Sequence, residues 1–240
     1  MSLKVLVLTT NTPHHAYFVG RLVDAGHDTH VIEETSAAAA SVEQNSFRSE
    51  CEDYENHRWF DGGQYSLGKL CPVESFPSIN EPEAKRFLES ESYDLALAFG
   101  VGVIRASTMS TLPALCLNLH GGDPQRYRGL DSHLWSVYHR DLGALITTLH
   151  LVNEKLDDGN IVSAGSLDLG QIETLYQLRA LNTEMAVDIS LGSLASIEAV
   201  GRAISYRQTT IGRYYSAMPG ELLDLCRARF ERLLKERLPQ

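Results

Sequence analysis

The sequence predicts an α/β fold, a three-layer sandwich built on a mostly parallel sheet. Residues 4–8 read Lys-Val-Leu-Val-Leu, an apolar run that is typical of a strand covered by helices on both faces. A polar turn, a helical pattern that ends at Gly26 and a second apolar strand follow. This order is that of a βαβ unit, whose crossover places its two strands parallel in one sheet.

The elements continue in the same alternation. Asn11-Thr12-Pro13 supplies a turn and a helix start, so we expect a helix over residues 16–25 and a strand over residues 28–32. Residues 34–69 are polar and aromatic with an alanine run at 37–40, and they predict a helical excursion at one edge of the sheet. Further strands are predicted at 94–98, 115–119, 145–152 and 161–167, and helices at 81–90, shortly after Val103, at 132–139 and over 172–200.

The chain divides into one large unit and a short tail. Residues 1–200 are expected to form one domain, and residues 201–240 are too few to fold alone. This tail contains Gly212-Arg-Tyr-Tyr215 and a basic helix over 221–237. We expect it to pack on the domain or at the interface of a homodimer.

Composition excludes several classes of partner. The 240 residues include 31 acidic and 21 basic side chains, a formal charge of −10, which disfavours nucleic acid and anionic membrane surfaces. No apolar run approaches the roughly 20 residues that span a bilayer. Neither the four cysteines nor the histidines have metal-ligand spacing, so we expect no metal and a reducing, cytoplasmic location; these residues are Cys51, Cys71, Cys116, Cys226, His133, His139 and His150.

Asn118 and His120 end a predicted apolar strand. Because side chains alternate along a strand, the two residues point to the same side. The ends of strands in open α/β sheets face the ligand crevice. An amide donor beside an imidazole suits the stabilisation of a developing oxyanion and the transfer of a proton. The alternative interpretation is that the pair caps a loop.

Two further segments add candidate groups. The loop after His120 carries glycines that allow close backbone approach, and Tyr127-Arg128 within it can clamp a polar substrate. The strand that ends near His150 leads to Asp157-Asp158-Gly159, where a carboxylate can orient an imidazole. An ordinary β-turn is the alternative for this second segment.

Together these segments resemble the catalytic core of the folate-dependent formyltransferase family. The resemblance rests on Asn118-Leu-His120, on a Pro-containing loop with Tyr127-Arg128-Gly129, and on Leu156-Asp157-Asp158-Gly159, and it spans about residues 1–200. It implies the Rossmann-like fold of that family. It also implies that Asn118, protonated His120 and Asp157 are catalytic, with Asp158 at a variable position.

The same resemblance implies the formyl donor, N10-formyltetrahydrofolate. Its pterin is expected beside the end of the 94–98 strand, with the turn before Asp158 closing the other side. The residues implied in this binding are Phe99, Gly100, Val101, Val103, Ile104, Asn153 and Asp157. A buried strand end is the alternative for residues 99–104.

The acceptor is suggested by the departures from the family pattern. Gly121-Gly122-Asp123-Pro124 stands where the family has Ser-Leu-Leu-Pro, so we expect this loop near the acceptor to have a different conformation. The short tail and acidic charge disfavour methionyl-tRNA, and residues 10–15 lack the glycine-rich phosphate cradle of the glycinamide ribonucleotide branch. The chain looks most like the small nucleotide-sugar N-formyltransferases of polysaccharide or O-antigen biosynthesis. We therefore expect small-molecule substrates.

The expected acceptor is a nucleotide-linked amino deoxysugar, for example a 4-amino-4,6-dideoxyhexose. The predicted acceptor contacts are Tyr127, Arg128, Asp131, Asn11 and His14. The alternatives are phosphoribosylglycinamide formylation, hydrolysis of formyltetrahydrofolate, and a binding module without catalysis.

Overall fold

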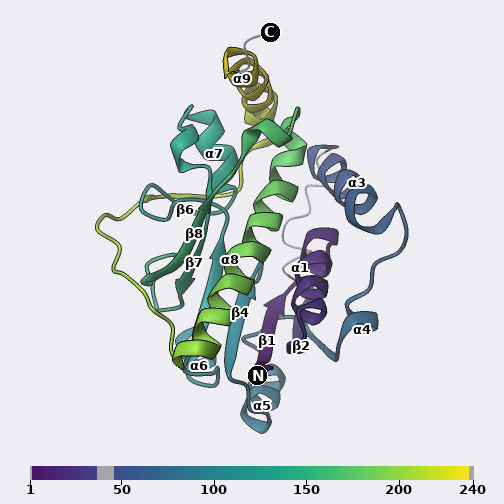
Figure 1. Cartoon of the computed structure of the whole chain (residues 1–240), viewed down its shortest axis with the longest axis vertical. Coiled ribbons are helices and arrows are strands. Elements are labelled where there is room, and N and C mark those ends of the chain that lie inside the picture. The colour runs from purple at the N-terminus through teal and green to yellow at the C-terminus, as the bar shows by residue number, and fades with distance from the viewer. Residues whose placement is uncertain (1, 37–45, 238–240) are drawn as a thin grey trace.

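A computed structural model describes residues 2–36 and 46–237 of the chain, so the predicted alanine run at 37–40 lies outside the described residues. Within these residues a seven-stranded sheet has the order β3-β2-β1-β4-β5-β7-β8, with helices on both faces (Figure 1). The predicted α/β sandwich is confirmed.

The sheet is parallel from β3 to β5 and antiparallel beyond it. The strand β3 is absent from the sequence prediction because it is a short edge strand with mostly exposed side chains. The other strands lie within a few residues of their predicted positions. The bounds are β1 (Lys4–Thr9), β2 (Asp28–Glu34), β3 (Val73–Phe76), β4 (Leu95–Phe99), β5 (Cys116–His120), β7 (Ile146–Leu151) and β8 (Ile161–Ser166).

Alternation along β1 divides the core between the two faces of the sheet. Val5 and Val7 pack toward one face, whereas Leu6 and Leu8 pack toward the other, and all four are fully buried. The first face is covered by α1 (Pro13–Asp24), α4 (Leu67–Leu70) and α8 (Leu178–Val200), with α3 (Ser46–Phe60) against α1. The second is covered by α5 (Pro82–Ser90) and the segment that contains α6 (Ala106–Met109).

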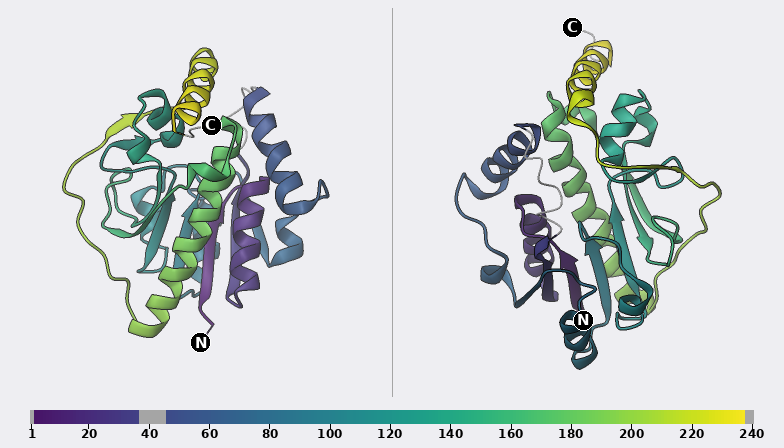
Figure 2. Two further views of the ribbon diagram at one scale, coloured as in Figure 1. Left: turned by 45° about the horizontal axis from the view of Figure 1, so that its top comes forward. Right: turned by 180° about the vertical axis from the view of Figure 1, so that it is seen from behind.

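The tail returns across the rest of the chain, and two of its elements pack or pair with that part (Figure 2). The strand β9 (Arg213–Tyr215) pairs in parallel with β6 (Tyr127–Gly129), and α9 (Gly220–Arg237) packs against α7 (Ser132–Tyr138). Cys226 and Phe230 of α9 are fully buried there. Neither β6 nor β9 is predicted from sequence, since each is three residues long and exists through its pairing with a distant segment.

Three short 3₁₀ turns complete the elements, at Leu142–Ala144, Leu169–Gln171 and Leu175–Gln177. None of the helices in the described part of the chain has the length and apolar content that a membrane span requires.

Candidate active site

Four polar side chains meet where β5, β7 and the turn before β8 come together. The antiparallel register pairs Asn118 of β5 directly with His150 of β7, and the Asn118 Nδ2 atom lies 3.1 Å from His150 Nε2. Asp157 lies between the two imidazoles: its Oδ1 is 3.5 Å from His150 Nε2 and its Oδ2 is 3.6 Å from His120 Nδ1. The structure thus brings Asn118, His120 and Asp157 together.

His150 is the member of this group that sequence reasoning missed. In the sequence, the spacing of His150 was weighed only against a metal site, because the pairing of β5 with β7 was not predicted. Its Nδ1–H donates to the Leu151 carbonyl at 2.9 Å. Because Nδ1 carries this proton, Nε2 of the neutral ring has a free lone pair and accepts the Asn118 amide N–H. In the imidazolium, Nε2 is protonated and donates to Asp157. The available signal in the sequence was a histidine in the strand that precedes the Asp157 turn.

The ring of His120 is held in one tautomer. Its Nε2–H donates to the Tyr127 carbonyl at 2.8 Å, so the lone pair of the neutral ring is on Nδ1, facing Asp157. Burial lowers the pKa of His120, while Asp157 and the Tyr127 carbonyl raise it by a smaller amount. Burial, the larger effect, thus favours the neutral imidazole, whose Nδ1 can accept a proton.

Asp157 is ionised although only 6% of its surface is exposed. Burial alone would raise the pKa of this carboxyl, but the hydrogen bond with His150, the charge of His120 and the Gly129 N–H together lower it to about 2. The Gly129 N–H donates to Oδ2 at 2.8 Å. A fixed negative charge beside two imidazoles stabilises whichever ring takes up a proton.

This ionisation makes stability depend on pH. An unfolded Asp titrates near 3.9, whereas folded Asp157 titrates at about 2. Its contribution to the free energy of unfolding, about 2 kcal/mol, is present above pH 4 and is lost as pH falls from 4 to 2. We expect Asp157→Asn to show a shallower loss of stability than the wild type over that interval in urea titrations. Parallel curves for the two proteins would contradict this.

The loop after β4 leaves the sheet beside these residues, since Ala98 pairs with Asn118. Gly100 has φ +81°, a left-handed conformation that turns the chain away from Phe99. The apolar side chain of Val103 is 70% exposed on this loop, whereas Ile104 is partly buried against the second face of the sheet, together with Val101.

Two polar residues that were not singled out from the sequence form hydrogen bonds with the backbone of this loop. Glu34, only 3% exposed, accepts the Gly102 N–H at 2.7 Å. Asn80 donates to the Val103 carbonyl and accepts the Arg105 N–H, both at 2.9 Å. Residues 100–105 are therefore fixed before any ligand arrives.

Three of the predicted acceptor contacts are engaged within the protein. The Tyr127 hydroxyl donates to Asp141 at 3.2 Å, and Asp131 accepts the Met218 N–H at 2.8 Å. Arg128 is 7% exposed, and its guanidinium donates to Asp158 and to Gln208. Asp131 and Arg128 thus join the site loop to the tail, and a role of the three side chains in substrate binding stays a prediction.

Of the remaining predicted residues, two are exposed and one is mostly buried. Asn11 is exposed just before α1, and His14, mostly buried, lies 3.5 Å from the Glu55 carboxylate. Asn153 is exposed before the Asp157 turn, where its Oδ1 accepts the Lys155 N–H at 2.9 Å. Their contacts with ligands stay predictions.

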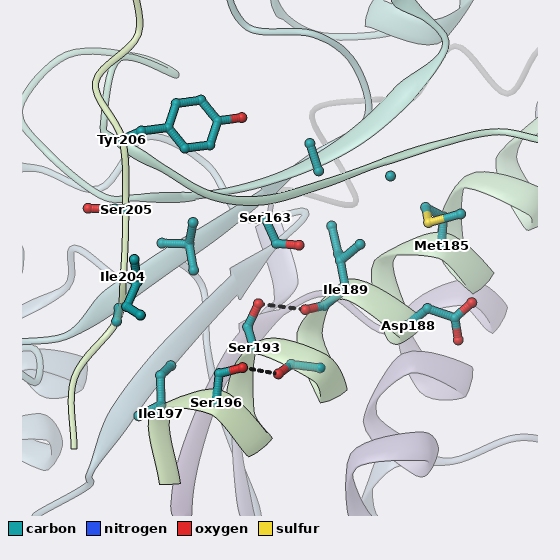
Figure 3. Close-up of a pocket in the computed structure, with 15 residues that line it drawn as sticks. Ser163, Met185, Asp188, Ile189, Ser193, Ser196, Ile197, Ile204, Ser205 and Tyr206 are labelled. Carbon is teal, nitrogen blue, oxygen red and sulfur yellow. Dashed lines mark hydrogen bonds between the residues drawn. The ribbon is translucent and has the colours of Figure 1, made fainter. Parts of the chain in front are cut away.

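A cavity of about 610 Å³ lies elsewhere, on the outer side of β8. It is bounded by Met185 and Ile189 of α8 and by residues 203–206, which diverge from β8 after the bridge between Ile161 and Tyr206 (Figure 3). None of the four site residues is part of its lining. The candidate site is therefore distinct from this cavity.

Comparison of the sequence with known proteins finds methionyl-tRNA formyltransferases, whereas no family model matches the chain. The enzyme of Syntrophus aciditrophicus is 28% identical over 129 residues, which cover 53% of this chain and 41% of the relative. That of Akkermansia muciniphila is 30% identical over 146 residues, which cover 60% and 46% respectively. The matched regions span less than half the length of these relatives.

Solved structures with the same fold include sugar N-formyltransferases. A 4-N formyltransferase from Francisella tularensis has a TM-score of 0.58 at 15% identity, covering 89% of this chain and 76% of that one. WlaRD, a sugar 3N-formyl transferase solved with dTDP and 5-N-formyl-THF, has a TM-score of 0.60 at 14% identity, covering 90% and 70%.

HypX from Aquifex aeolicus, solved with tetrahydrofolic acid, shares the fold over a smaller part of a longer chain. Its TM-score is 0.57 at 15% identity, and the match covers 92% of this chain and 31% of that one. The structural similarity to these solved proteins extends over most of this chain, and the sequence similarity to the methionyl-tRNA formyltransferases covers somewhat more than half of it. The chain is thus similar in sequence to methionyl-tRNA formyltransferases and shares the fold of the sugar N-formyltransferases and HypX.

Proposed function

We propose that this protein transfers a formyl group from N10-formyltetrahydrofolate to a primary amine. The observation that carries the proposal is the position of Asp157, within 3.6 Å of one imidazole and 3.5 Å of another, beside the Asn118 amide. A fixed carboxylate, proton-accepting rings and an amide donor at a strand end are the groups that acyl transfer to an amine requires. The likeness to formyltransferases supports the same reaction.

The folate would supply an activated formyl group on N10. Residues 100–105 fit the pterin, because Glu34 and Asn80 already fix the backbone of the loop and Val103 presents an exposed apolar side chain. A preformed, partly apolar wall with backbone polar groups is typical of a cofactor site.

The roles of the residues follow from their geometry. Asn118 is half-buried, and an amide hydrogen that does not face His150 can donate to the negative charge that develops on the formyl oxygen. A carbon–nitrogen bond forms to the acceptor amine and the bond to N10 breaks. His120 accepts the proton that the attacking nitrogen loses and returns it toward N10, while Asp157 stabilises the imidazolium between these steps.

For the acceptor we propose an amino sugar carried on a nucleotide. The sugar N-formyltransferases share the fold over 70–76% of their own chains. The formal charge of −10 also disfavours an RNA acceptor. A 4-amino-4,6-dideoxyhexose is the example that we would test first.

The test measures tetrahydrofolate release by the full chain with N10-formyltetrahydrofolate and one acceptor at a time. The panel comprises dTDP- and UDP-linked amino sugars, phosphoribosylglycinamide and methionyl-tRNA, with each N-acetylated sugar as a control that has no free amine. We expect release only with an amino sugar, together with a mass gain of one formyl group. Release without acceptor would identify a hydrolase, and release only with one of the other two acceptors would assign that branch instead.

A further inference from the structure

The tail crosses the turn that carries Asp157. Gln208 extends its side chain onto this turn, and its Nε2 donates to the carbonyls of Asp157 at 2.9 Å and Gly159 at 2.8 Å. Just before it, Tyr206 is joined to Ile161 by two backbone hydrogen bonds of 2.8 and 2.9 Å. The tail is therefore anchored at the start of β8, and Gln208 follows directly on that anchor.

Arg128 holds the same turn from the other side. Its guanidinium donates to the Asp158 carboxylate at 2.9 Å and to the Gln208 Oε1 at 3.0 Å, while its Nε donates to the Pro124 carbonyl at 2.9 Å. Because this side chain is 8% exposed, these bonds are shielded from water. Gln208 and Arg128 thus form one hydrogen-bonded unit around the turn.

The turn needs such support because its backbone is strained. Asp157 has φ +50°, a left-handed conformation that residues other than glycine adopt at a cost in free energy. Gly159 is packed so closely that an added Cβ would lie 1.6 Å from the Leu151 carbonyl oxygen. The Asp157 and Gly159 carbonyls would lose these hydrogen bonds without Gln208, since their partners come from its side chain.

We propose that Gln208 is a positioning residue for Asp157, acting through the backbone of the turn. It holds the carboxylate between His120 and His150, so the tail completes the site although it supplies no reacting group. The consequence for turnover rests on the proposed function, whereas the positioning itself does not.

Two variants of Gln208 and one matched control test this role. Gln208→Ala removes the whole link, and Gln208→Glu retains the shape and the pairing with Arg128 but has no N–H for the two carbonyls. Thr209→Ala removes a neighbouring tail bond, from the Thr209 hydroxyl to Gln125 at 2.9 Å, which does not reach the turn.

We expect both Gln208 variants to lower kcat by about 10- to 100-fold, the effect of a small displacement of a catalytic group, with KM changing much less. Thr209→Ala should retain the kcat of the wild type. A purely structural role for Gln208 would instead lower the melting temperature and leave kcat unchanged in the folded protein.

A second readout does not depend on activity. The charged or titratable groups that act on His120 include Asp157, His150, Asp123 and His133, and Asp157 contributes most to raising its pKa. NMR titration of the His120 imidazole should therefore show a lower midpoint in both Gln208 variants than in the wild type and Thr209→Ala. An unchanged midpoint in folded Gln208→Glu would overturn the proposal. If the His120 midpoint is lowered in the Gln208 variants but the wild type transfers no formyl group, the positioning role stands and the proposed function is wrong.

Discussion

Replacement of Asp157 by Asn is expected to reduce formyl transfer by about 10²- to 10⁴-fold, the range that a positioned acid–base group contributes. The amide has nearly the same shape and can still accept the Gly129 N–H. It has no negative charge, however, so an imidazolium formed at His120 loses its nearest counter-charge, 3.6 Å away. The loss should appear in kcat, because the carboxylate acts after both substrates are bound.

The measurement is steady-state turnover, with circular dichroism and thermal melting to verify the fold. Asp168→Asn is a suitable control, since the Asp168 carboxylate also accepts a backbone N–H, from Gly170 at 3.0 Å, but lies in an exposed loop. The control should retain full activity. If Asp157→Asn kept more than a tenth of the wild-type kcat, the carboxylate would have no central role in the reaction.

The largest effect on stability is expected from Arg179→Met. Arg179 of α8 forms two hydrogen bonds, of 2.6 and 2.8 Å, with Glu55 of α3, whose side chain is fully buried. Methionine fills similar volume but leaves the carboxylate without its main partner. Breaking a buried ion pair from one side costs about 3–5 kcal/mol, most of it the cost of the uncompensated charge.

Urea denaturation should show this loss, and the paired change Glu55→Gln with Arg179→Met should recover much of it, because the remaining group is neutral. Equal stabilities of the single and double variants would contradict this account. The single variant should also lose less stability than the wild type as pH falls through the titration range of histidine. The Nδ1 of His14 lies 3.5 Å from Glu55, and burial and Arg179 both lower the pKa of that ring. Without Arg179 this pKa is lowered less, so the difference in proton uptake between the unfolded and folded states is smaller.

Much of the fold could be predicted because its signals are local. The Lys-Val-Leu-Val-Leu run of β1 and the helical spacing before Gly26 each reflect burial of neighbouring residues. The short strands β3, β6 and β9 could not be predicted in this way. β6 is a strand because Tyr127, Arg128 and Gly129 pair with residues 213–215, and no feature of the three residues themselves requires that pairing.

The residues of the candidate site likewise differ in whether local patterns or tertiary contacts reveal them. Asn118 and His120 were found from alternation on one strand, and Asp157 from its turn and from a family resemblance. His150 was missed because its relation to Asn118 depends on the antiparallel register of β5 and β7. A sequence also cannot show that the Arg128 guanidinium is buried among Pro124, Asp158 and Gln208.

The sequence by itself thus determined the layered α/β architecture and the types of group available for chemistry, because hydrophobic periodicity and short motifs are properties of adjacent residues. The tertiary structure alone decided which ionisable groups lie close enough to interact and which residues hold them in position. The pKa of Asp157 and that of His120 are both lowered by their surroundings, and Gln208 reaches the Asp157 turn from a segment about 50 residues further along the chain. Burial and electrostatic coupling depend on those distances in space, which no local pattern encodes.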